Sequence, residues 1–527
     1  MSFRKNTFAS AGCFSASRHS PQVRALIVSG LAGSQPHTTA ADAPTAQSKT
    51  AKSANLFIGL IILETLPTPA RLRSLALPAA SLFALSIVSF AGLTRVGLLS
   101  ADEPRYAAIG RAMAATGDWI TPRLWGTPWF EKPPLIYWTT AIGFRLGLGD
   151  ELAPRLPIAL LSAGFLVFLF LTVRRDFGAR AAWFACTMLA TSAGWLAFSH
   201  IAVTDLPVTI FFSAALLMAL HPGRGRAIAA GVFLGLAVLS KALVPLALLL
   251  PALWFLRRRL AELALLCLAA AAVALPWFLL CYSRNGAPFL DDLIWKQHFA
   301  RFLTASLQHV QPFWYYAPVL IAGLFPWSPA LWLVFQRRFY DDDRLRLLMA
   351  TAVFGFVFFS ASRNKLPGYL LPLVPALAIL MGVALDRAKT RAAGVVLGAC
   401  GLLLGCLPAI REIVPQALLS GISHVSFPFD LSAVVLALIA IPCWYLERRG
   451  YRTGAFALTA IVIFGALLVF VAEELPGLDI AASARPIWRN RLSKVSNPCV
   501  SKLNRAIHFG INYYADREIP DCPASKP

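Results

Sequence analysis

The sequence predicts an all-α, polytopic membrane protein. Of its 527 residues, 57% are hydrophobic and only 14% are charged, and the mean hydropathy is +0.64. A single soluble core does not have this composition. The apolar residues also stand in blocks close to the ~20 residues that cross a bilayer, such as 263–282 and 454–472.

Block length indicates about thirteen transmembrane helices. They are predicted at residues 75–94, 156–173, 181–199, 201–220, 227–240, 242–256, 263–282, 313–335, 347–361, 366–385, 392–410, 431–446 and 454–472. The run at 135–149 is also apolar apart from Arg145. We expect it to lie at the membrane interface, because another span there would reverse every later loop.

Positive charge supports this topology. The formal net charge is +22, but Lys and Arg gather in short clusters between apolar blocks, not on one basic face that would suit nucleic acid. With the N-terminus inside, alternation of the spans places every cluster in the cytoplasm, as the positive-inside rule requires. The clusters fall within 174–180, 224–226, 257–259, 337–346, 387–391 and 448–452.

The chain divides into three parts. Residues 1–70 are rich in Ala, Ser, Thr and Pro, and we expect a disordered or poorly defined leader. Residues 71–472 form the membrane domain, and an odd number of spans exports a small tail, 473–527. In that tail, Cys499 and Cys522 stand apart from the six cysteines in or beside the spans, so export would allow a disulfide between them.

The chemistry is expected in the outer loops at 95–155 and 283–312. No Walker-type or Rossmann glycine loop occurs, so nothing points to a nucleotide. The first loop opens with Asp102-Glu103-Pro104-Arg105-Tyr106. Its carboxylates beside an Arg suit a base that accepts a proton from a hydroxyl, and an acidic helix N-terminus is the alternative.

Two further acidic positions follow. Glu131 and Lys132 stand in an aromatic and proline-rich string, where Lys suits a phosphate, although interfacial anchoring is the plainer interpretation. Asp205 lies near the outer end of an otherwise apolar span. A carboxylate there is a functional candidate by default, with simple exposure beside His200 as the alternative.

The second loop carries His298 and Arg301, which share one helical face at i and i+3. Imidazole with a carboxylate can hold a divalent ion and Arg can bind phosphate, whereas a structural His beside aromatics is the alternative. The turn from Arg363 to Tyr369 is basic and lies on the outer side, against the positive-inside trend. This placement indicates an anionic ligand.

In this order the strings resemble the bacterial lipid A aminoarabinose transferases and the wider polyprenyl- or dolichyl-phosphate-sugar glycosyltransferases related to protein O-mannosyltransferases. The resemblance runs from about residue 75 to 385. It implies a GT-C type bundle with outer-face juxtamembrane helices and a small C-terminal periplasmic domain. It also implies a glycosyltransferase of the bacterial inner membrane whose active site faces the periplasm.

The resemblance further implies the role of each residue. Asp102 would be essential for transfer, with Asp205 as the second acidic position. A divalent cation, zinc or magnesium, would be held by Glu131 and His298. The lipid phosphate of the substrate would be contacted by Lys132, Arg105, Arg301 and Tyr369.

The implied reaction moves a sugar from a polyprenyl-phosphate carrier to a lipid A, glycolipid or protein acceptor, without a nucleotide. The sequence leaves the sugar open between 4-amino-4-deoxy-L-arabinose and a hexose. A lipid or sugar transporter or flippase is the rival hypothesis, and it predicts charges near midplane in broken helices. Here the charged residues concentrate in outer loops, which favours a surface enzyme.

Overall fold

The computed structural model describes residues 89–303, 310–420, 431–501 and 503–522. The predicted leader, 1–70, and most of the first predicted span therefore lie outside the described residues. The described chain is largely helical, and its one sheet is an antiparallel hairpin of β1 (Arg123–Leu124) and β2 (Thr127–Pro128).

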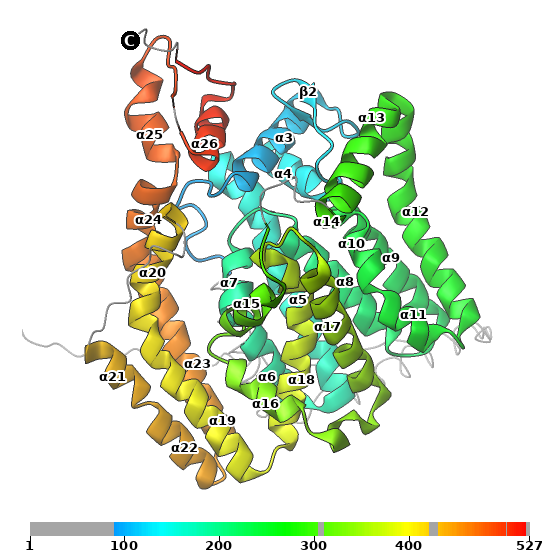
Figure 1. The fold of residues 1–527 in the computed structure, drawn as a ribbon, viewed down its shortest axis with the longest axis vertical. Coiled ribbons are helices and arrows are strands. Elements are labelled where there is room, and N and C mark those ends of the chain that lie inside the picture. Colours follow the sequence, from blue (N-terminus) through cyan, green and yellow to red (C-terminus); the bar gives the residue numbers. More distant parts are fainter. Residues whose placement is uncertain (1–88, 304–309, 421–430, 502, 523–527) are drawn as a thin grey trace, which may run out of the picture. The chain divides into compact units, whose positions relative to one another are not determined.

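Seven helical segments of the described chain are long and apolar enough to cross a membrane, or nine if each of two bent pairs is one span (Figure 1). The chain is therefore a multi-pass membrane protein, as the apolar blocks predict. The bent pairs are α6 (Ala179–Ala190) with α7 (Ala193–Ser199), at 63°, and residues 313–323 with 328–334, at 111°. The seven segments lie in α5 (Gly149–Phe177), α12 (Leu260–Asn285), α17 (Asp343–Ala361), η5 (Pro367–Leu373) with α18 (Val374–Arg387), α19 (Thr390–Leu403) with α20 (Leu407–Ser420), α21 (Leu431–Ala437) with α22 (Ala440–Arg448), and α23 (Arg452–Val469) with α24 (Leu475–Ala482).

Three predicted spans have different bounds or are broken in the structure. The block at 201–220 forms α8 (Asp205–Ala219), and the block at 227–240 forms α9 (Arg224–Lys241). The block at 242–256 is broken into α10 (Val244–Leu248) and α11 (Leu250–Leu256). Each of these two short helices has a proline in its first turn, where the missing N–H costs no hydrogen bond but prevents continuation of the preceding helix.

Helix α18 forms the centre of the bundle. Its residues 374–385 are all apolar or glycine, and all of them are buried. A helix that is apolar on every side is expected to lie inside the bundle. Gly382 lets α18 approach α6 closely, because a Cβ there would lie 2.6 Å from the backbone nitrogen of Ala185. Gly231 brings α9 onto α12 in the same way, with Leu266 O 2.3 Å from the added Cβ. Small residues at helix contacts are typical of membrane bundles.

The basic clusters meet at one end of the bundle. Arg180 pairs with Asp386, and Arg452 donates to the carbonyl of Leu385 at 2.8 Å. Helix α5 ends at Phe177, whose ring lies 4.8 Å from the Arg344 guanidinium, and it begins beside the outer loop. Its 29 residues separate the two ends by about 40 Å, so the clusters lie about one membrane thickness from that loop.

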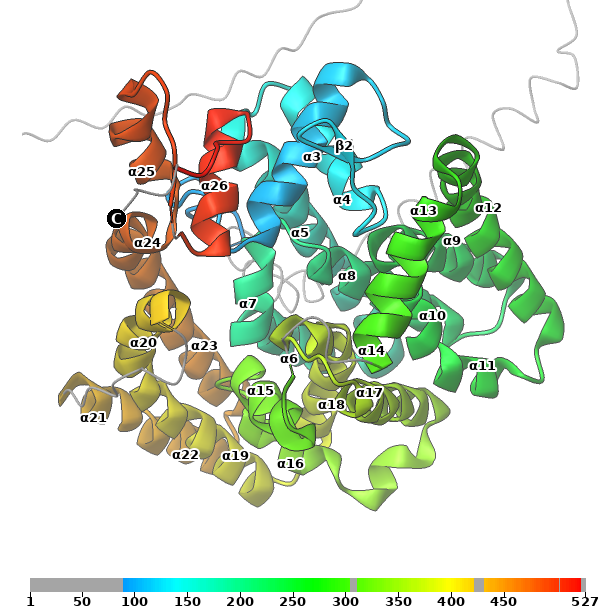
Figure 2. The same cartoon turned by 45° about the horizontal axis from the view of Figure 1, so that its top comes forward.

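The predicted first outer loop forms α3 (Asp102–Thr116) and α4 (Leu135–Arg145), which lie beside each other at the opposite end (Figures 1 and 2). Gly110 of α3 packs on Thr140 of α4, and Gly143 of α4 packs on Ala153 of α5. With 11 residues, α4 is too short to cross a bilayer. The apolar run at 135–149 is thus not a span, as the charge pattern predicts.

The tail folds back over α3. Its helices are α24, α25 (Arg485–Asn490) and α26 (Arg505–Ala515), and α26 packs against α3 (Figure 2). The expected disulfide between Cys499 and Cys522 is confirmed, and the loop that it closes contains all of α26. Backbone hydrogen bonds reinforce this closure, including Cys522 N–H to Val500 O at 2.8 Å.

This disulfide predicts a labelling pattern in spheroplasts. Cys499 and Cys522 should react with a membrane-impermeant maleimide only after reduction, whereas Cys499→Ser should expose Cys522 to the reagent directly. The same variant should destabilise the tail by about 3 kcal/mol through lost loop closure, measured by hydrogen exchange in α26. Cys267→Ser, at a free cysteine of α12, is the control and should change neither result. Labelling of the unreduced wild-type pair would contradict the bridge.

Candidate active site

A buried ion pair fixes the start of α3. Glu103 accepts two bonds from the guanidinium of Arg155 on α5, each at 2.7 Å, and both side chains are almost completely buried. The same carboxylate accepts the backbone N–H groups of Leu99 at 2.7 Å and Ala202 at 2.9 Å. Arg155 also donates to the carbonyls of residues 93, 96 and 97. The segment at 93–99 and the start of the segment before α8 are thus tied to one charge pair.

The two adjacent carboxylates therefore have different surroundings. Successive residues of a helix point about 100° apart, so Asp102 faces outward where Glu103 faces inward. The Asp102 side chain is 42% exposed and pairs with Arg105, one turn along α3. Of the two, only Asp102 is accessible to a substrate. Both carboxylates lie in the first turn of α3, so the string does form an acidic helix N-terminus.

Arg105 links Asp102 to the second acidic string. Its guanidinium donates to Glu131 at 2.6 Å, to Asp102, and through Nε to Ala101 O at 2.9 Å. Its side chain is only 3% exposed. The predicted contact between Arg105 and a lipid phosphate does not match this placement, because the guanidinium is turned toward two carboxylates and lies outside the cavity lining described below.

Glu131 is surrounded by cations. Burial alone would raise its pKa, but Lys132, Arg105 and Arg301 outweigh burial and lower the pKa to about 2. Since this value is below the ordinary 4.5, the ionised carboxylate stabilises the fold above about pH 4.5 and loses that contribution as the pH falls toward 2. The pKa of Lys132 is lowered, chiefly by burial, although Glu131 opposes the shift.

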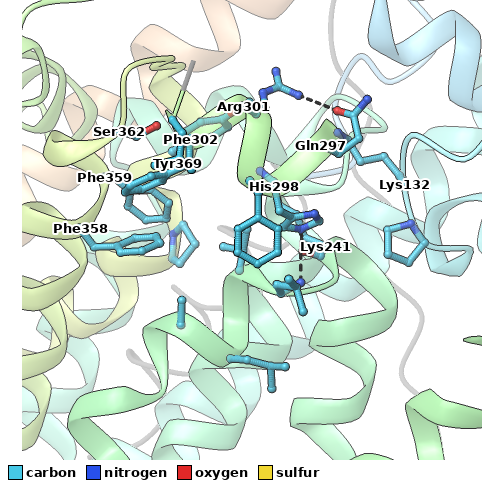
Figure 3. Close-up of a pocket in the computed structure, with 18 of the residues that line it drawn as sticks. Lys132, Lys241, Gln297, His298, Arg301, Phe302, Phe358, Phe359, Ser362 and Tyr369 are labelled. Atoms are coloured by element: carbon cyan, nitrogen blue, oxygen red, sulfur yellow. Dashed lines mark hydrogen bonds between the residues drawn. The ribbon is translucent and has the colours of Figure 1, made fainter. Parts of the chain in front are cut away.

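A cavity of about 570 Å³ opens beside this charge cluster. Figure 3 shows Lys132 and Lys241 on one side, the rings of Phe358, Phe359 and Tyr369 on the other, and Arg301 between them. The polar part is lined by Glu131, Lys132, Lys241, Gln297, His298 and Arg301, and the apolar part includes Val244, Leu246, Phe299, Phe302, Phe358 and Phe359. The cavity is therefore amphipathic, with a charged end and an oily end.

Asp205 is linked to the cavity through Lys241, a residue that the sequence analysis did not single out. Asp205 begins α8 and accepts from Lys241 at the end of α9, at 2.7 Å. Lys241 lines the cavity and lies 4.8 Å from the ring of Tyr369. The sequence did contain evidence for a functional Lys241, because it is a lone cation between two apolar blocks on the predicted outer side. Gly368 fits Asp205 closely, since a Cβ there would lie 2.7 Å from the carboxylate.

Arg301 is positioned by the turn at 362–369. Asn364 donates to Arg301 O at 2.6 Å, and the N–H of Arg363 donates to Phe302 O at 3.2 Å. Lys365 is buried and donates to backbone carbonyls, so the basic turn supports the cavity wall and contributes Tyr369 to its lining. Arg301 Nη1 donates to Gln297 at 3.2 Å, and its buried Nε has no hydrogen-bond partner among the described residues.

His298 serves as a tie between two backbone segments. It lies in the π-helix η1 (Asp291–Ala300), where its Nδ1 lies 2.8 Å from Leu293 O. Its Nε2 lies 3.3 Å from the backbone nitrogen of Leu243 and 3.4 Å from Lys241 O. Burial lowers the pKa of His298 and keeps the ring neutral. The side chain thus holds η1 against the corner between α9 and α10.

The residues proposed as metal ligands do not fit that role. Both ring nitrogens of His298 face backbone groups, and the carboxylate of Glu131 is taken by Arg105, Lys132 and Trp129. Across the described ranges, no group of three or more His, Cys, Asp or Glu residues could hold a metal ion. A cation would also have to enter a cluster already rich in positive charge. No step through zinc or magnesium follows from this geometry.

Comparison with known proteins gives consistent matches. Residues 131–282 match the family model described as dolichyl-phosphate-mannose-protein mannosyltransferase. The undecaprenyl phosphate-alpha-4-amino-4-deoxy-L-arabinose arabinosyl transferase of Pseudomonas aeruginosa (strain UCBPP-PA14) is 30% identical over 83% of this chain and 88% of its own. The enzyme of the same name from Edwardsiella ictaluri is 31% identical over 69% of this chain and 71% of its own.

A solved structure agrees with these matches. The crystal structure of ArnT from Cupriavidus metallidurans bound to undecaprenyl phosphate has a TM-score of 0.66 and 30% identity, covering 86% of this chain and 87% of that one. The helical bundle, its outer-face helices and these relatives define a membrane glycosyltransferase of the GT-C class. The chain belongs to the family of undecaprenyl phosphate-alpha-4-amino-4-deoxy-L-arabinose arabinosyl transferases.

Because Glu103 is buried and Asp102 is partly exposed, substitutions of the two residues should affect the stability of the fold unequally. Glu103→Gln leaves Arg155 buried without its counter-charge and should cost about 3–5 kcal/mol. Asp102→Asn, at a partly exposed position, should cost less than about 1 kcal/mol. Thermal unfolding in one detergent, followed by tryptophan fluorescence, compares the two. Equal melting temperatures would show that the Glu103 pair does not hold the first loop.

Proposed function

We propose that this protein transfers 4-amino-4-deoxy-L-arabinose from undecaprenyl phosphate to lipid A. The observation that carries the proposal is the amphipathic cavity: three cations and one carboxylate line its charged end, and apolar side chains line the rest. A polyprenyl phosphate has the same division, with an anionic head and a hydrocarbon tail. The names of the P. aeruginosa and E. ictaluri relatives support this donor and this sugar.

The phosphate is bound by Lys132, Lys241 and Arg301. Arg301 supports this role because its buried Nε lacks a partner in the described chain and is available to an oxygen atom. Negative charge grows on the phosphate as its bond to the anomeric carbon breaks, and fixed cations in a water-poor cavity stabilise that change. Tyr369 borders the same space and keeps Lys241 and Arg301 beside its ring. Asp205 orients Lys241 through their ion pair.

The acceptor approaches from the side of Asp102. An acceptor oxygen forms the new bond to the anomeric carbon, the undecaprenyl phosphate leaves with the electron pair of the old bond, and Asp102 takes the proton of the acceptor. Arg105 supports this role because its guanidinium pairs with the Asp102 carboxylate and holds it in place. Glu131 holds Arg105 and Lys132 in place and does not ligate a metal. A glycolipid or protein hydroxyl would react by the same step.

The membrane arrangement belongs to the same proposal. Thirteen spans across a bacterial inner membrane place the basic clusters in the cytoplasm. They place the cavity mouth and the small tail domain, residues 473–527, in the periplasm. The grouping of the basic clusters at the end of the bundle away from α3 supports this orientation. The disulfide in the tail supports it as well, because such bonds persist in oxidising compartments.

Purified protein in nanodiscs tests the proposal with synthetic undecaprenyl-phosphate aminoarabinose and lipid A. Asp102→Asn should abolish transfer while donor binding is retained. Lys132→Ala and Arg301→Ala should each lower kcat/KM by about 100-fold or more, because each removes a preorganised partner of the leaving phosphate. Mass spectrometry of lipid A reports the product.

Arg284→Ala provides the matched control. Arg284 is an outer-face arginine that pairs with Asp118 and does not line the cavity, and its loss should leave the rate unchanged. Chelation should also leave transfer unchanged, since the Glu131 and His298 atoms are already engaged. Near-wild-type turnover by Asp102→Asn would overturn its assignment as the base. Turnover with a glycolipid or protein but not with lipid A would show that lipid A is not the acceptor.

A further inference from the structure

The C-terminal helix α26 reaches the catalytic cluster. Phe509 of α26 places its ring centroid 5.0 Å from the guanidinium carbon of Arg105. Trp129 and Tyr106 lie around the same guanidinium, at 5.7 and 6.0 Å. Arg105 is thus enclosed by three aromatic rings, two from the first outer loop and one from the far end of the chain.

The rings and the hydrogen bonds restrain Arg105 in different ways. The hydrogen bonds to Ala101 O, Asp102 and Glu131 occupy its edges. The aromatic groups add attraction between the cation and the rings, which grows when water is excluded. With its side chain 3% exposed, this guanidinium has little access to water. Removing a ring would therefore let water and alternative side-chain conformations compete for Arg105.

The position of Phe509 is itself well fixed. One turn later, Tyr513 donates to Asp150 O at 2.7 Å and accepts through its carbonyl from Arg111 at 2.9 Å. Tyr514 accepts the N–H of Leu98 at 2.9 Å, directly before the catalytic string. Gly510 fits against Ala484, where a Cβ would lie 2.6 Å from the alanine Cβ. Together with the disulfide loop, these contacts make α26 a rigid support for Phe509.

We infer that Phe509 is a positioning residue of the transferase: its aromatic face holds Arg105, and Arg105 holds Asp102 at the cavity. The inference rests on the proposed function for the role of Asp102. It gives the tail a part in catalysis through contacts on the first outer loop, without any contact between Phe509 and the donor phosphate. It also explains why a tail helix is anchored both to Arg111 of α3 and to Leu98, shortly before α3 begins.

Aromatic and non-aromatic substitutions of Phe509 distinguish the positioning role from simple packing. Phe509→Ala and Phe509→Leu should lower kcat for transfer about tenfold, with little change in the KM for the donor, because the phosphate-binding cations are untouched. Phe509→Tyr and Phe509→Trp should stay within about twofold of the wild type, since both keep a face for the cation. Ile507→Ala is the matched control on the same helix. Ile507 packs into the small core of the tail and should not alter kcat.

Hydrogen exchange gives a second result that does not need activity. Backbone amides of residues 99–106 should exchange faster in Phe509→Leu than in Phe509→Tyr, and at the wild-type rate in Ile507→Ala. If wild-type protein fails to transfer the sugar, the proposed function fails and exchange alone still decides the positioning role. Equal kcat values, or equal exchange when turnover is absent, for Phe509→Leu and Phe509→Tyr would overturn the inference.

Discussion

The cost of burying charge at one end of a membrane bundle shapes the whole site. Glu103 and Arg155 are nearly inaccessible, and an isolated charge in such a place is strongly unfavourable. The structure meets this cost by giving both groups several partners, most of them backbone groups of the segments around 93–99 and 202. The pair therefore fixes where α3 begins, and with it the direction of the next residue, Asp102.

From that fixed point the other charges follow in sequence. Asp102 meets Arg105, Arg105 meets Glu131, and Glu131 meets Lys132 at the edge of the cavity. Asp205 in turn holds Lys241, which also lines the cavity. Each carboxylate directs a cation, yet the cavity lining itself contains more cations than carboxylates. An anionic head group balances this surplus, whereas a metal ion would increase it.

Much of this arrangement was predictable from the sequence, because it depends on local chemistry. Apolar block length and the basic clusters gave a multi-pass bundle and kept 135–149 out of the span count. The strings around Asp102, Glu131 and Arg301 indicated the parts of the chain that meet at the cluster. The pairing of Cys499 with Cys522 followed from their isolation in the tail.

Other features depend on the fold and lie beyond a single sequence. The residues around Glu103 do not indicate that it faces inward to Arg155, because the residue at which α3 begins decides which of the two carboxylates is buried. His298 has ligand chemistry, but a π-helix and the corner at Leu243 take both of its nitrogens. Phe509 is one aromatic among many, and its contact with Arg105 joins positions about four hundred residues apart. Lys241 was the exception, because its lone charge between two apolar blocks was visible.

The central claim is that the charged end of the cavity binds the phosphate of a polyprenyl donor. Electron cryomicroscopy of the protein in nanodiscs with undecaprenyl phosphate tests this most directly. The account predicts phosphate density within about 4 Å of the Lys132 ammonium and the Arg301 guanidinium, with the prenyl chain running along Phe358 and Phe359. Phosphate density at another surface, with this cavity occupied by ordinary lipid chains alone, would contradict it.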